Sequence, residues 1–202
     1  MWSSAEIKAA YERVKAEVGP NVQVVVATKY VPVELMDRLV EAGVETVGEN
    51  RAQDLEAKHE QYGPHFRWHF IGHLQSRKAP IVSRLCELCH SLDSTSAARK
   101  LTIPALIEVN LSGEVTKSGV APSAVPGFLA EVRALGVDVR GLMTMPPLSD
   151  DPERSRPYFR TLRGLAGELG LPELSMGTTQ DYHVAAEEGA TMVRVGSVLF
   201  GR

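Results

Sequence analysis

The sequence predicts an α/β protein, a single (β/α)8 TIM barrel that spans residues 1–202. Short apolar segments alternate with amphipathic segments along the chain, which is typical of a parallel sheet covered by helices. Eight such apolar segments are present, and the barrel needs eight strands. The length of 202 residues allows one well-buried core and argues against two full domains. A doubly wound open sheet is the alternative that this alternation leaves open.

The first helix and the first strand have the clearest signals. Ser3 and Glu6 have the spacing of a capping box, and apolar residues at helical spacing follow until Gly19-Pro20 ends the helix. The segment Val22–Thr28 is rich in β-branched residues, which is typical of a strand covered on both faces.

The other elements repeat this alternation to the end of the chain. The expected strands are Val22–Thr28, Val44–Val47, Trp68–Ile71, Leu88–Leu92, Ala105–Val109, Val139–Met143, Leu174–Met176 and Met192–Val195. The helices expected between them are Val33–Ala42, Arg51–Gln61, Arg77–Leu85, Thr95–Arg99, Ala124–Leu135, Tyr158–Leu169 and Asp181–Glu188. Glycine directly follows several of these helices, as is common where a helix ends.

Composition excludes several classes of protein. Hydrophobic residues make up 44% of the chain, charged residues 23%, and the formal net charge is -3, so a strongly basic nucleic-acid binder is not expected. No apolar run approaches the roughly 20 residues that span a bilayer. The N-terminus lacks the basic and apolar regions of a signal peptide. We therefore expect a cytoplasmic protein with no nucleic-acid or membrane partner.

Two further patterns match known site motifs, one for haem attachment and one for a metal ion, but we expect neither site here. Cys86, Cys89 and His90 match the haem-attachment pattern C-x-x-C-H, but that chemistry requires export, so we expect two buried thiols that pack as small hydrophobes. The spacing of His69 and His73 suits a metal ion only on a helix, and this stretch is predicted to be a strand and a loop. No metal site is expected.

Lys29 is the first candidate functional residue, because barrel proteins carry their functional groups at the C-terminal ends of the strands. Its side chain would begin in the barrel mouth, where an ammonium group is poorly solvated. Desolvation favours the neutral amine, the form that attacks an aldehyde to make a Schiff base. The alternative is that Lys29 extends into solvent or pairs with Glu49.

Two glycine-containing turns could bind a phosphate group. Gly177-Thr178-Thr179 precedes the helix that begins at Asp181, and Gly196-Ser197 follows the last strand, where many barrels bind phosphate. The alternative is a plain turn with a helix cap.

Arg194, on the last expected strand, could donate to a ring nitrogen while remaining protonated. The alternative for this residue is a salt bridge to Glu49 or Glu108.

Together these segments resemble the pyridoxal phosphate homeostasis proteins (the YggS/PROSC-like family), relatives of the alanine racemase N-terminal domain. The resemblance covers nearly the whole chain. The segments that carry it are Val25–Lys29, Gly48–Asn50, Trp68–Gln75, Asn110–Gly119, Gly141–Met143, Ser175–Gly177, Val193–Gly196 and Phe200-Gly201. The chain departs from the family at Gly177-Thr178-Thr179, where Gly-Met-Ser is usual. Thr179 keeps the hydroxyl but adds a methyl group at the phosphate seat.

The resemblance implies a fold-type III barrel that binds pyridoxal 5′-phosphate (PLP), with Lys29 carrying the cofactor covalently. Thr179 and the backbone of Gly196 and Ser197 would hold the phosphate, and Arg194 would face the pyridine nitrogen. Such an arginine disfavours the pyridinium form that makes PLP a strong electron sink. The residues expected to line the ring pocket are Asn50, His69 and Met143.

The function that the resemblance implies is PLP binding in intracellular homeostasis, without turnover of an amino acid. The protein would buffer the cofactor and could deliver it to PLP-dependent apoenzymes. A racemase is the main alternative, but related racemases take a second base from another domain, and this chain ends at Arg202 just after the expected barrel. The absence of that domain weakly favours a monomer. A Schiff-base aldolase acting on a sugar phosphate is a third possibility.

Overall fold

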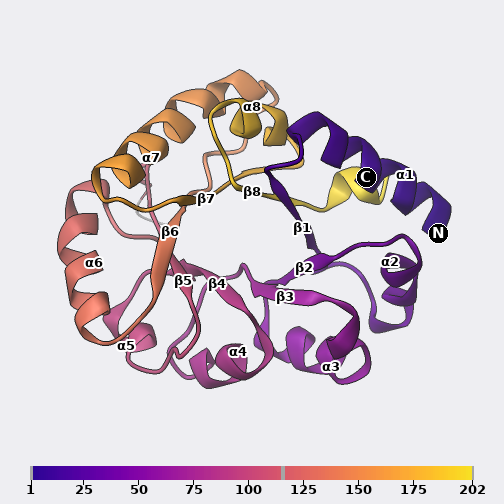
Figure 1. Cartoon of the computed structure of the whole chain (residues 1–202), viewed down its shortest axis with the longest axis horizontal. Helices are drawn as coiled ribbons and strands as arrows, with labels where there is room; N and C mark the ends of the chain where they lie inside the picture. Colours follow the sequence, from indigo (N-terminus) through magenta and orange to yellow (C-terminus); the bar gives the residue numbers. More distant parts are fainter. Residues whose placement is uncertain (1, 115–116, 202) are drawn as a thin grey trace.

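The computed structural model describes residues 2–114 and 117–201, so the segment 110–119 includes two residues outside the described ones. Eight parallel strands form a closed barrel with helices around it, which confirms the predicted fold (Figure 1). The strands are β1 (Gln23–Ala27), β2 (Thr46–Glu49), β3 (Arg67–Phe70), β4 (Leu88–Leu92), β5 (Ala105–Glu108), β6 (Val139–Met143), β7 (Glu173–Thr178) and β8 (Met192–Val195).

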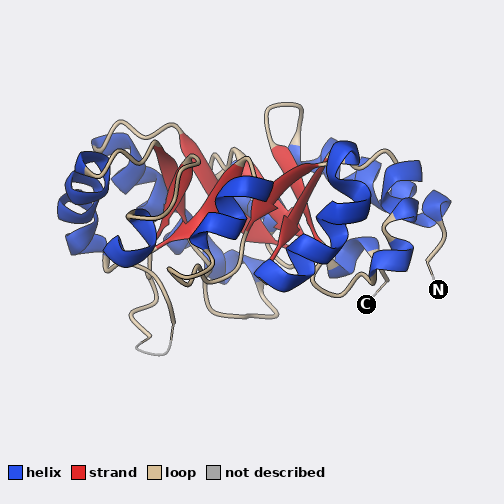
Figure 2. Ribbon diagram, turned by 90° about the horizontal axis from the view of Figure 1, so that it is seen from below, coloured by secondary structure: helices blue, strands red, loops and turns tan. Residues whose placement is uncertain are grey.

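The helix α1 precedes the first strand, the other α-helices lie between strands in sequence, and the helices surround the strands in space (Figures 1 and 2). The α-helices are α1 (Ser4–Val18), α2 (Asp37–Glu41), α3 (Ala52–Tyr62), α4 (Ala79–Leu85), α5 (Thr95–Ala98), α6 (Val125–Ala134), α7 (Arg156–Glu168) and α8 (Tyr182–Glu187). Short 3-10 helices are η1 (Val33–Leu35), η2 (Gly63–His65), η3 (Pro122–Ala124), η4 (Pro152–Ser155) and η5 (Ser197–Leu199).

Strand pairing closes the sheet and rules out the open-sheet alternative. Each strand pairs in parallel with the next, and β8 pairs with β1, where Val25 is opposite Arg194. The main shift from expectation is β2, which begins at Thr46 and extends to Glu49. Gly48 and Glu49 pair with β3 and are buried, so the strand continues past its last apolar residue.

The helix α1 completes the outer ring next to the C-terminal end of the chain (Figure 1). It contacts α2, α8 and η5, and the predicted capping box of Ser3 and Glu6 is present. The Tyr182 hydroxyl donates to a carboxylate oxygen of Glu17, and the rings of Trp2 and Phe200 lie 4.7 Å apart. The N-terminal helix therefore covers the side of the barrel next to α8 and η5.

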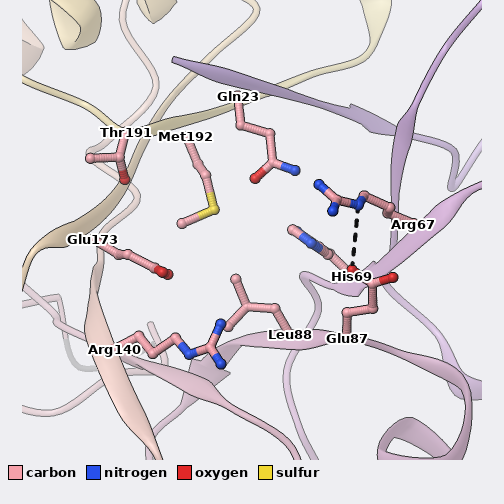
Figure 3. A pocket seen from close by; sticks show the side chains of 9 residues that line it. All are labelled: Gln23, Arg67, His69, Glu87, Leu88, Arg140, Glu173, Thr191 and Met192. Carbon is pink, nitrogen blue, oxygen red and sulfur yellow. Dashed lines mark ion pairs between the residues drawn. The ribbon is translucent and has the colours of Figure 1, made fainter. Parts of the chain in front are cut away.

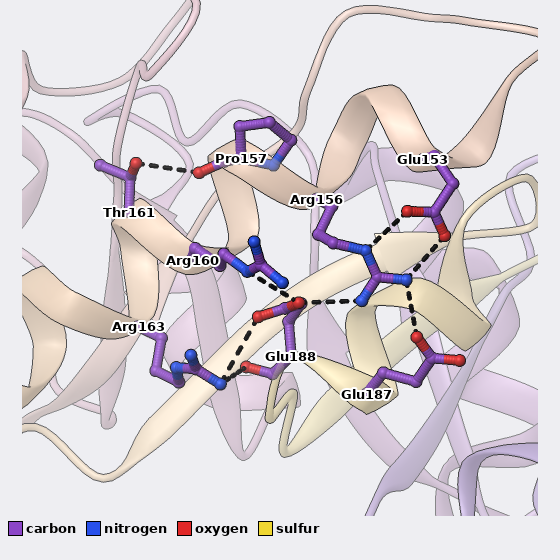
Figure 4. Close-up of polar contacts among 8 residues, drawn as sticks. All are labelled: Glu153, Arg156, Pro157, Arg160, Thr161, Arg163, Glu187 and Glu188. Atoms are coloured by element: carbon purple, nitrogen blue, oxygen red, sulfur yellow. Dashed lines mark hydrogen bonds and ion pairs between the residues drawn. The ribbon is translucent and has the colours of Figure 1, made fainter.

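An arginine cluster joins α7 to α8 on the outside of the barrel (Figure 4). Glu188, whose side chain is 5% exposed, accepts from Arg156 Nη1 at 2.8 Å and from Arg160 Nε at 3.0 Å. Arg163 lies 3.5 Å from the other oxygen of this carboxylate. Hydrogen bonds from Arg156 and Arg160 hold the pKa of Glu188 below its ordinary value, so the carboxylate stays charged.

Both cysteines are free and buried, as expected. Burial raises the pKa of the Cys89 thiol to about 11 and also raises that of Cys86, so neither is a ready thiolate. None of the helices formed by residues 2–114 and 117–201 is long and apolar enough to cross a membrane.

Candidate functional site

A cavity of about 380 Å³ opens at the C-terminal ends of the strands, where the sequence places the functional groups. We call it the C-terminal cavity. It is lined by Trp2, Ala27, Lys29, Tyr30, Asn50, Ile71, Met145, Leu148, Thr178, Thr179, Gln180, Arg194, Gly196, Ser197 and Phe200. Six expected site residues meet here, namely Lys29, Asn50, Thr179, Arg194, Gly196 and Ser197.

Two expected site residues, His69 and Met143, do not line this cavity. Met143 is buried with Leu88, Leu106 and Met192. The residues two positions further along, Ile71 and Met145, line the cavity instead. Both lie beyond the last residues of β3 and β6, closer to the barrel mouth than His69 and Met143. His69 and Met143 therefore lie deeper in the barrel than the cavity.

Lys29 differs from expectation in its environment. It lies in the turn after β1 and its side chain is exposed, with Nζ 4.7 Å from the centre of the Tyr30 ring. The residue that is buried at the end of this strand is Thr28. The side chain is therefore not enclosed in the barrel mouth as expected, although the residue does line the C-terminal cavity.

Glu49 pairs with neither Lys29 nor Arg194, because a buried lysine of α3 occupies it. Lys58 Nζ donates to Glu49 Oε1 and, at 2.6 Å, to the carbonyl oxygen of Thr28. The Thr28 hydroxyl donates to the same Glu49 oxygen at 2.5 Å. The Lys58–Glu49 pair therefore links the ends of β1 and β2, because Thr28 directly precedes Lys29 and Glu49 directly precedes Asn50.

Asn50, which lines the cavity, carries a buried acceptor without a partner. Its Oδ1 is the one buried side-chain polar atom without a hydrogen-bond partner among the described residues. Its backbone N–H donates to Glu49 Oε2 at 3.2 Å. A buried acceptor without a donor is costly, so a donor from a bound ligand or an ordered water would stabilise it.

Arg194 is 6% exposed and lies between the barrel interior and the cavity. Nη1 donates to the carbonyl oxygen and the hydroxyl of Ser175 at 2.9 and 2.5 Å, and Nη2 donates to the carbonyl oxygen of Thr144 at 3.0 Å. The expected alternative partner Glu108 instead accepts from Ser118. Burial lowers the pKa of Arg194 to about 10, which leaves it protonated at neutral pH.

The two phosphate-type turns contact each other. The N–H of Gly196 donates to Thr179 Oγ1 at 3.1 Å, and the N–H and hydroxyl of Thr178 donate to Asp181 Oδ1 at 2.7 and 3.1 Å. The backbone N–H groups of Thr179 and Ser197 have no acceptor among the described residues. These two amides remain available at the cavity wall, whereas the Gly196 N–H is already engaged.

A second cavity, the N-terminal cavity, lies at the opposite end of the barrel and has a volume of about 280 Å³ (Figure 3). It is lined by Gln23, Arg67, His69, Glu87, Leu88, Arg140, Glu173, Thr191 and Met192. Figure 3 shows their side chains around a shared space, with Arg67 paired to Glu87 at 3.7 Å. His69 therefore lies in the part of the barrel interior that is nearest the N-terminal cavity.

Sequence reasoning missed the apolar rim of the C-terminal cavity. Tyr30, Met145 and Leu148 are 66%, 52% and 86% exposed, and all three line the opening. Trp2 and Phe200 come to the same wall from the two ends of the chain. No local pattern marks these residues, because they lie outside the strands and meet only through the fold.

The chain is similar in sequence to one protein family and to curated proteins that share one name. Residues 3–202 match the family model of the alanine racemase N-terminal domain. The pyridoxal phosphate homeostasis protein of Aquifex aeolicus is 42% identical over 192 residues, which cover 87% of this chain and 84% of the relative. The protein of the same name from Deinococcus radiodurans is 39% identical over 175 residues, which cover 83% and 82%.

Solved structures extend the likeness. PipY of Synechococcus elongatus PCC7942, solved with PLP bound, has a TM-score of 0.88 and 31% identity, and the match covers 96% of this chain and all of PipY. An alanine racemase of Clostridium difficile 630 has a TM-score of 0.76 at 15% identity. That match covers 98% of this chain but 57% of the racemase, and at this identity it shows a shared fold alone.

Proposed function

Because this chain belongs to the family of pyridoxal phosphate homeostasis proteins, within the alanine racemase N-terminal domain family, we propose that it binds PLP in the C-terminal cavity. Its role would be to hold and buffer the cofactor without turning over an amino acid. The observation that carries the proposal is the buried, unsatisfied Oδ1 of Asn50, a residue that lines the cavity together with Lys29 and Arg194.

The cavity suits each part of PLP. Its volume of about 380 Å³ falls within the range of small-molecule sites. Ile71 and Met145 offer apolar surface to the ring, and Asn50 Oδ1 would accept from the ring hydroxyl. The free amides of Thr179 and Ser197, together with their hydroxyls, would hold the phosphate. Binding at Gly196 N–H would require the present hydrogen bond to Thr179 to give way.

Lys29 would form the covalent link. Its neutral amine would attack the aldehyde of PLP with loss of water, and the resulting Schiff base would join Nζ to the aldehyde carbon. The exposed side chain needs only to turn from the Tyr30 ring into the cavity that Lys29 lines.

Arg194 favours holding the cofactor over using it. Nε of Arg194 has no hydrogen-bond partner among the residues that the structure describes, and a guanidinium can only donate. Facing the pyridine nitrogen, it would keep that nitrogen an acceptor without a proton of its own. PLP in this state is a weaker electron sink, so carbanion chemistry is disfavoured.

Spectroscopy of the purified protein tests the assignment. Added PLP is expected to give the absorbance of a Schiff base, and borohydride reduction is expected to leave a PLP adduct on Lys29 that mass spectrometry locates. Lys29→Ala should abolish this adduct but keep weaker, phosphate-anchored binding. Lys8→Ala removes an exposed lysine of α1 and serves as the control. Adduct formation at another lysine would contradict the role of Lys29, and loss of all noncovalent affinity would contradict a separate phosphate seat.

Racemisation is the second candidate, because the family model is that of the alanine racemase N-terminal domain. Incubation of the PLP-loaded protein with L-alanine decides between the two. Accumulation of D-alanine that is lost in Lys29→Ala would replace a holding role with a catalytic one.

A further inference from the structure

A continuous row of buried polar side chains crosses the barrel interior from Arg194 to the N-terminal cavity. Arg194 Nη1 lies 2.5 Å from Ser175 Oγ, Ser175 Oγ lies 2.8 Å from His90 Nδ1, and His90 Nε2 lies 2.9 Å from His69 Nδ1. All four side chains are buried, with His90 and Ser175 fully enclosed. We call these four residues the interior chain.

The arginine at one end fixes the direction of every hydrogen bond in this chain. A guanidinium only donates, so Ser175 Oγ accepts from it. Among the described residues, His90 Nδ1 is the one acceptor within reach of the Ser175 hydroxyl, so the O–H turns toward it. His90 Nδ1 is then an acceptor, and the proton of the neutral ring lies on Nε2. That proton is donated to His69 Nδ1, which leaves the proton of His69 on its own Nε2.

The chain ends at the N-terminal cavity. His69 lines this cavity, and its Nε2 has no partner among the described residues. Arg67 and Arg140 enter the same cavity, as do the carboxylates of Glu87 and Glu173 (Figure 3). The interior chain thus connects the cavity proposed for PLP with a second cavity at the other end of the barrel.

We propose that Ser175, His90 and His69 are positioning residues that hold Arg194 at the cofactor site. In this arrangement every hydrogen bond of the interior chain is donated in the direction away from Arg194, and both histidines are neutral with the proton on Nε2. The part that concerns the cofactor rests on the proposed function. The tautomers of the histidines do not, because they follow from the donors and acceptors of the protein alone.

The surrounding charges support neutral rings. Burial, His69 and Arg194 all lower the pKa of His90 well below its ordinary value. Burial and Arg67 lower the pKa of His69 to about 4. If His90 Nδ1 took up a proton in addition to the one on Nε2, the ring would be an imidazolium. It would then donate to Ser175 instead of accepting from it and would place a second positive charge beside the guanidinium, so it would break the chain.

Nitrogen-15 NMR of the histidine rings in the cofactor-free protein at pH 8 tests the direction of the chain. Both His69 and His90 are expected as neutral rings with the proton on Nε2. An Nδ1–H tautomer of His90, or an imidazolium form of either ring, would overturn the proposal. If the tautomers are as expected but the protein takes up no PLP, the proposed function fails while the chain direction stands.

Substitution of Ser175 tests the positioning role. Ser175→Ala removes one acceptor from Arg194 and the donor of His90, and the dissociation constant for PLP is expected to rise about tenfold. The absorption maximum of bound PLP should also move, which a loss of stability alone would not cause. Ser175→Thr keeps the hydroxyl and should restore the wild-type spectrum. Ser155→Ala, which removes another buried hydroxyl outside the chain, is the control. Equal spectra and affinities for Ser175→Ala and Ser155→Ala would exclude the role.

Discussion

Gly72 determines where Asn50 lies at the cavity wall. A Cβ on residue 72 would lie 2.1 Å from the carbonyl oxygen of Asn50 and 2.6 Å from its Cα, so another side chain would push the Asn50 backbone away. The backbones of these two residues can approach this closely only because one of them is glycine. The unsatisfied acceptor of the site is therefore positioned by a neighbour that does not contact the cavity.

Gly72→Ala should consequently weaken both stability and cofactor binding. Overpacking against a backbone that cannot move freely is expected to lower the free energy of unfolding by about 1–3 kcal/mol, measured by urea denaturation. Gly127→Ala in α6 meets nothing within 4 Å and is the control, with a gain of about 0.5–1 kcal/mol. A Gly72→Ala protein as stable as Gly127→Ala, with wild-type PLP affinity, would contradict this account.

The site residues show what the sequence can and cannot predict. That Lys29, Asn50 and Arg194 line one cavity could be predicted, because each lies on a strand or shortly after one, where barrel function concentrates. His69 was expected beside these residues but lines the N-terminal cavity, because alternation along a strand specifies which side chains face the barrel interior and not their depth. How deeply β3 sits relative to β8 depends on strand register around the whole barrel, which no local pattern of residues encodes.

At the scale of elements, the Lys58–Glu49 pair connects α3 to the ends of β1 and β2. Removing one partner of a buried pair leaves an uncompensated charge, so Lys58→Met is expected to cost about 3–5 kcal/mol of unfolding free energy. Lys58→Met with Glu49→Gln removes both charges and should recover much of that loss. Denaturant unfolding of the single and double variants measures the difference.

The control for this experiment is an exposed ion pair between α3 and α4. Arg84 and Glu56 form an ion pair at 3.1 Å, with 65% and 41% of their side chains exposed. Arg84→Met should change stability by less than about 1 kcal/mol, because exposed pairs contribute little. If Lys58→Met lowered the free energy of unfolding no more than Arg84→Met, the buried pair would not be holding the two strand ends.

Element boundaries followed the sequence where a clear signal existed. Strands β4, β6 and β8 have the expected bounds, and the capping box begins α1 as expected. The expected helix Val33–Ala42 is instead η1 followed by α2, because Met36 N–H bonds to Val33 at 3-10 spacing while Val40 N–H bonds to Met36 at α spacing. Both spacings place similar residues on the buried side, so periodicity does not separate them.

For the whole molecule, alternation of strands and helices predicted a parallel sheet but left its closure open. Closure depends on the pairing of Val25 with Arg194, residues from opposite ends of the chain. It also brings an unusual set of side chains into the barrel interior, where apolar residues normally dominate. Here His69, His90, Ser175 and Arg194 occupy one connected region, so part of the barrel centre is polar and hydrogen-bonded.

The neutral histidines of this region should make global stability depend on pH. Burial lowers the pKa of His69 to about 4 from an ordinary value of 6.5, and it lowers that of His90 as well. Between these pH values the unfolded chain binds protons that the folded chain excludes, so the free energy of unfolding falls as the pH drops from 6.5 toward 4. Above pH 6.5 both rings are neutral in either state, and their contribution is constant.

His69 alone should contribute about 1.4 kcal/mol per pH unit in this window, or about 3 kcal/mol across it. Carboxylates also titrate at the acidic end, so the decisive quantity is the difference between wild-type protein and His69→Gln in urea unfolding from pH 8 to pH 4. That difference should shrink as the pH falls, because the variant no longer excludes this proton. His65→Gln, at an exposed position in η2, should follow the wild-type curve. Parallel curves for wild type and His69→Gln would mean that His69 takes up its proton in the folded barrel, and the interior chain could not then run from Arg194 to the N-terminal cavity in one direction.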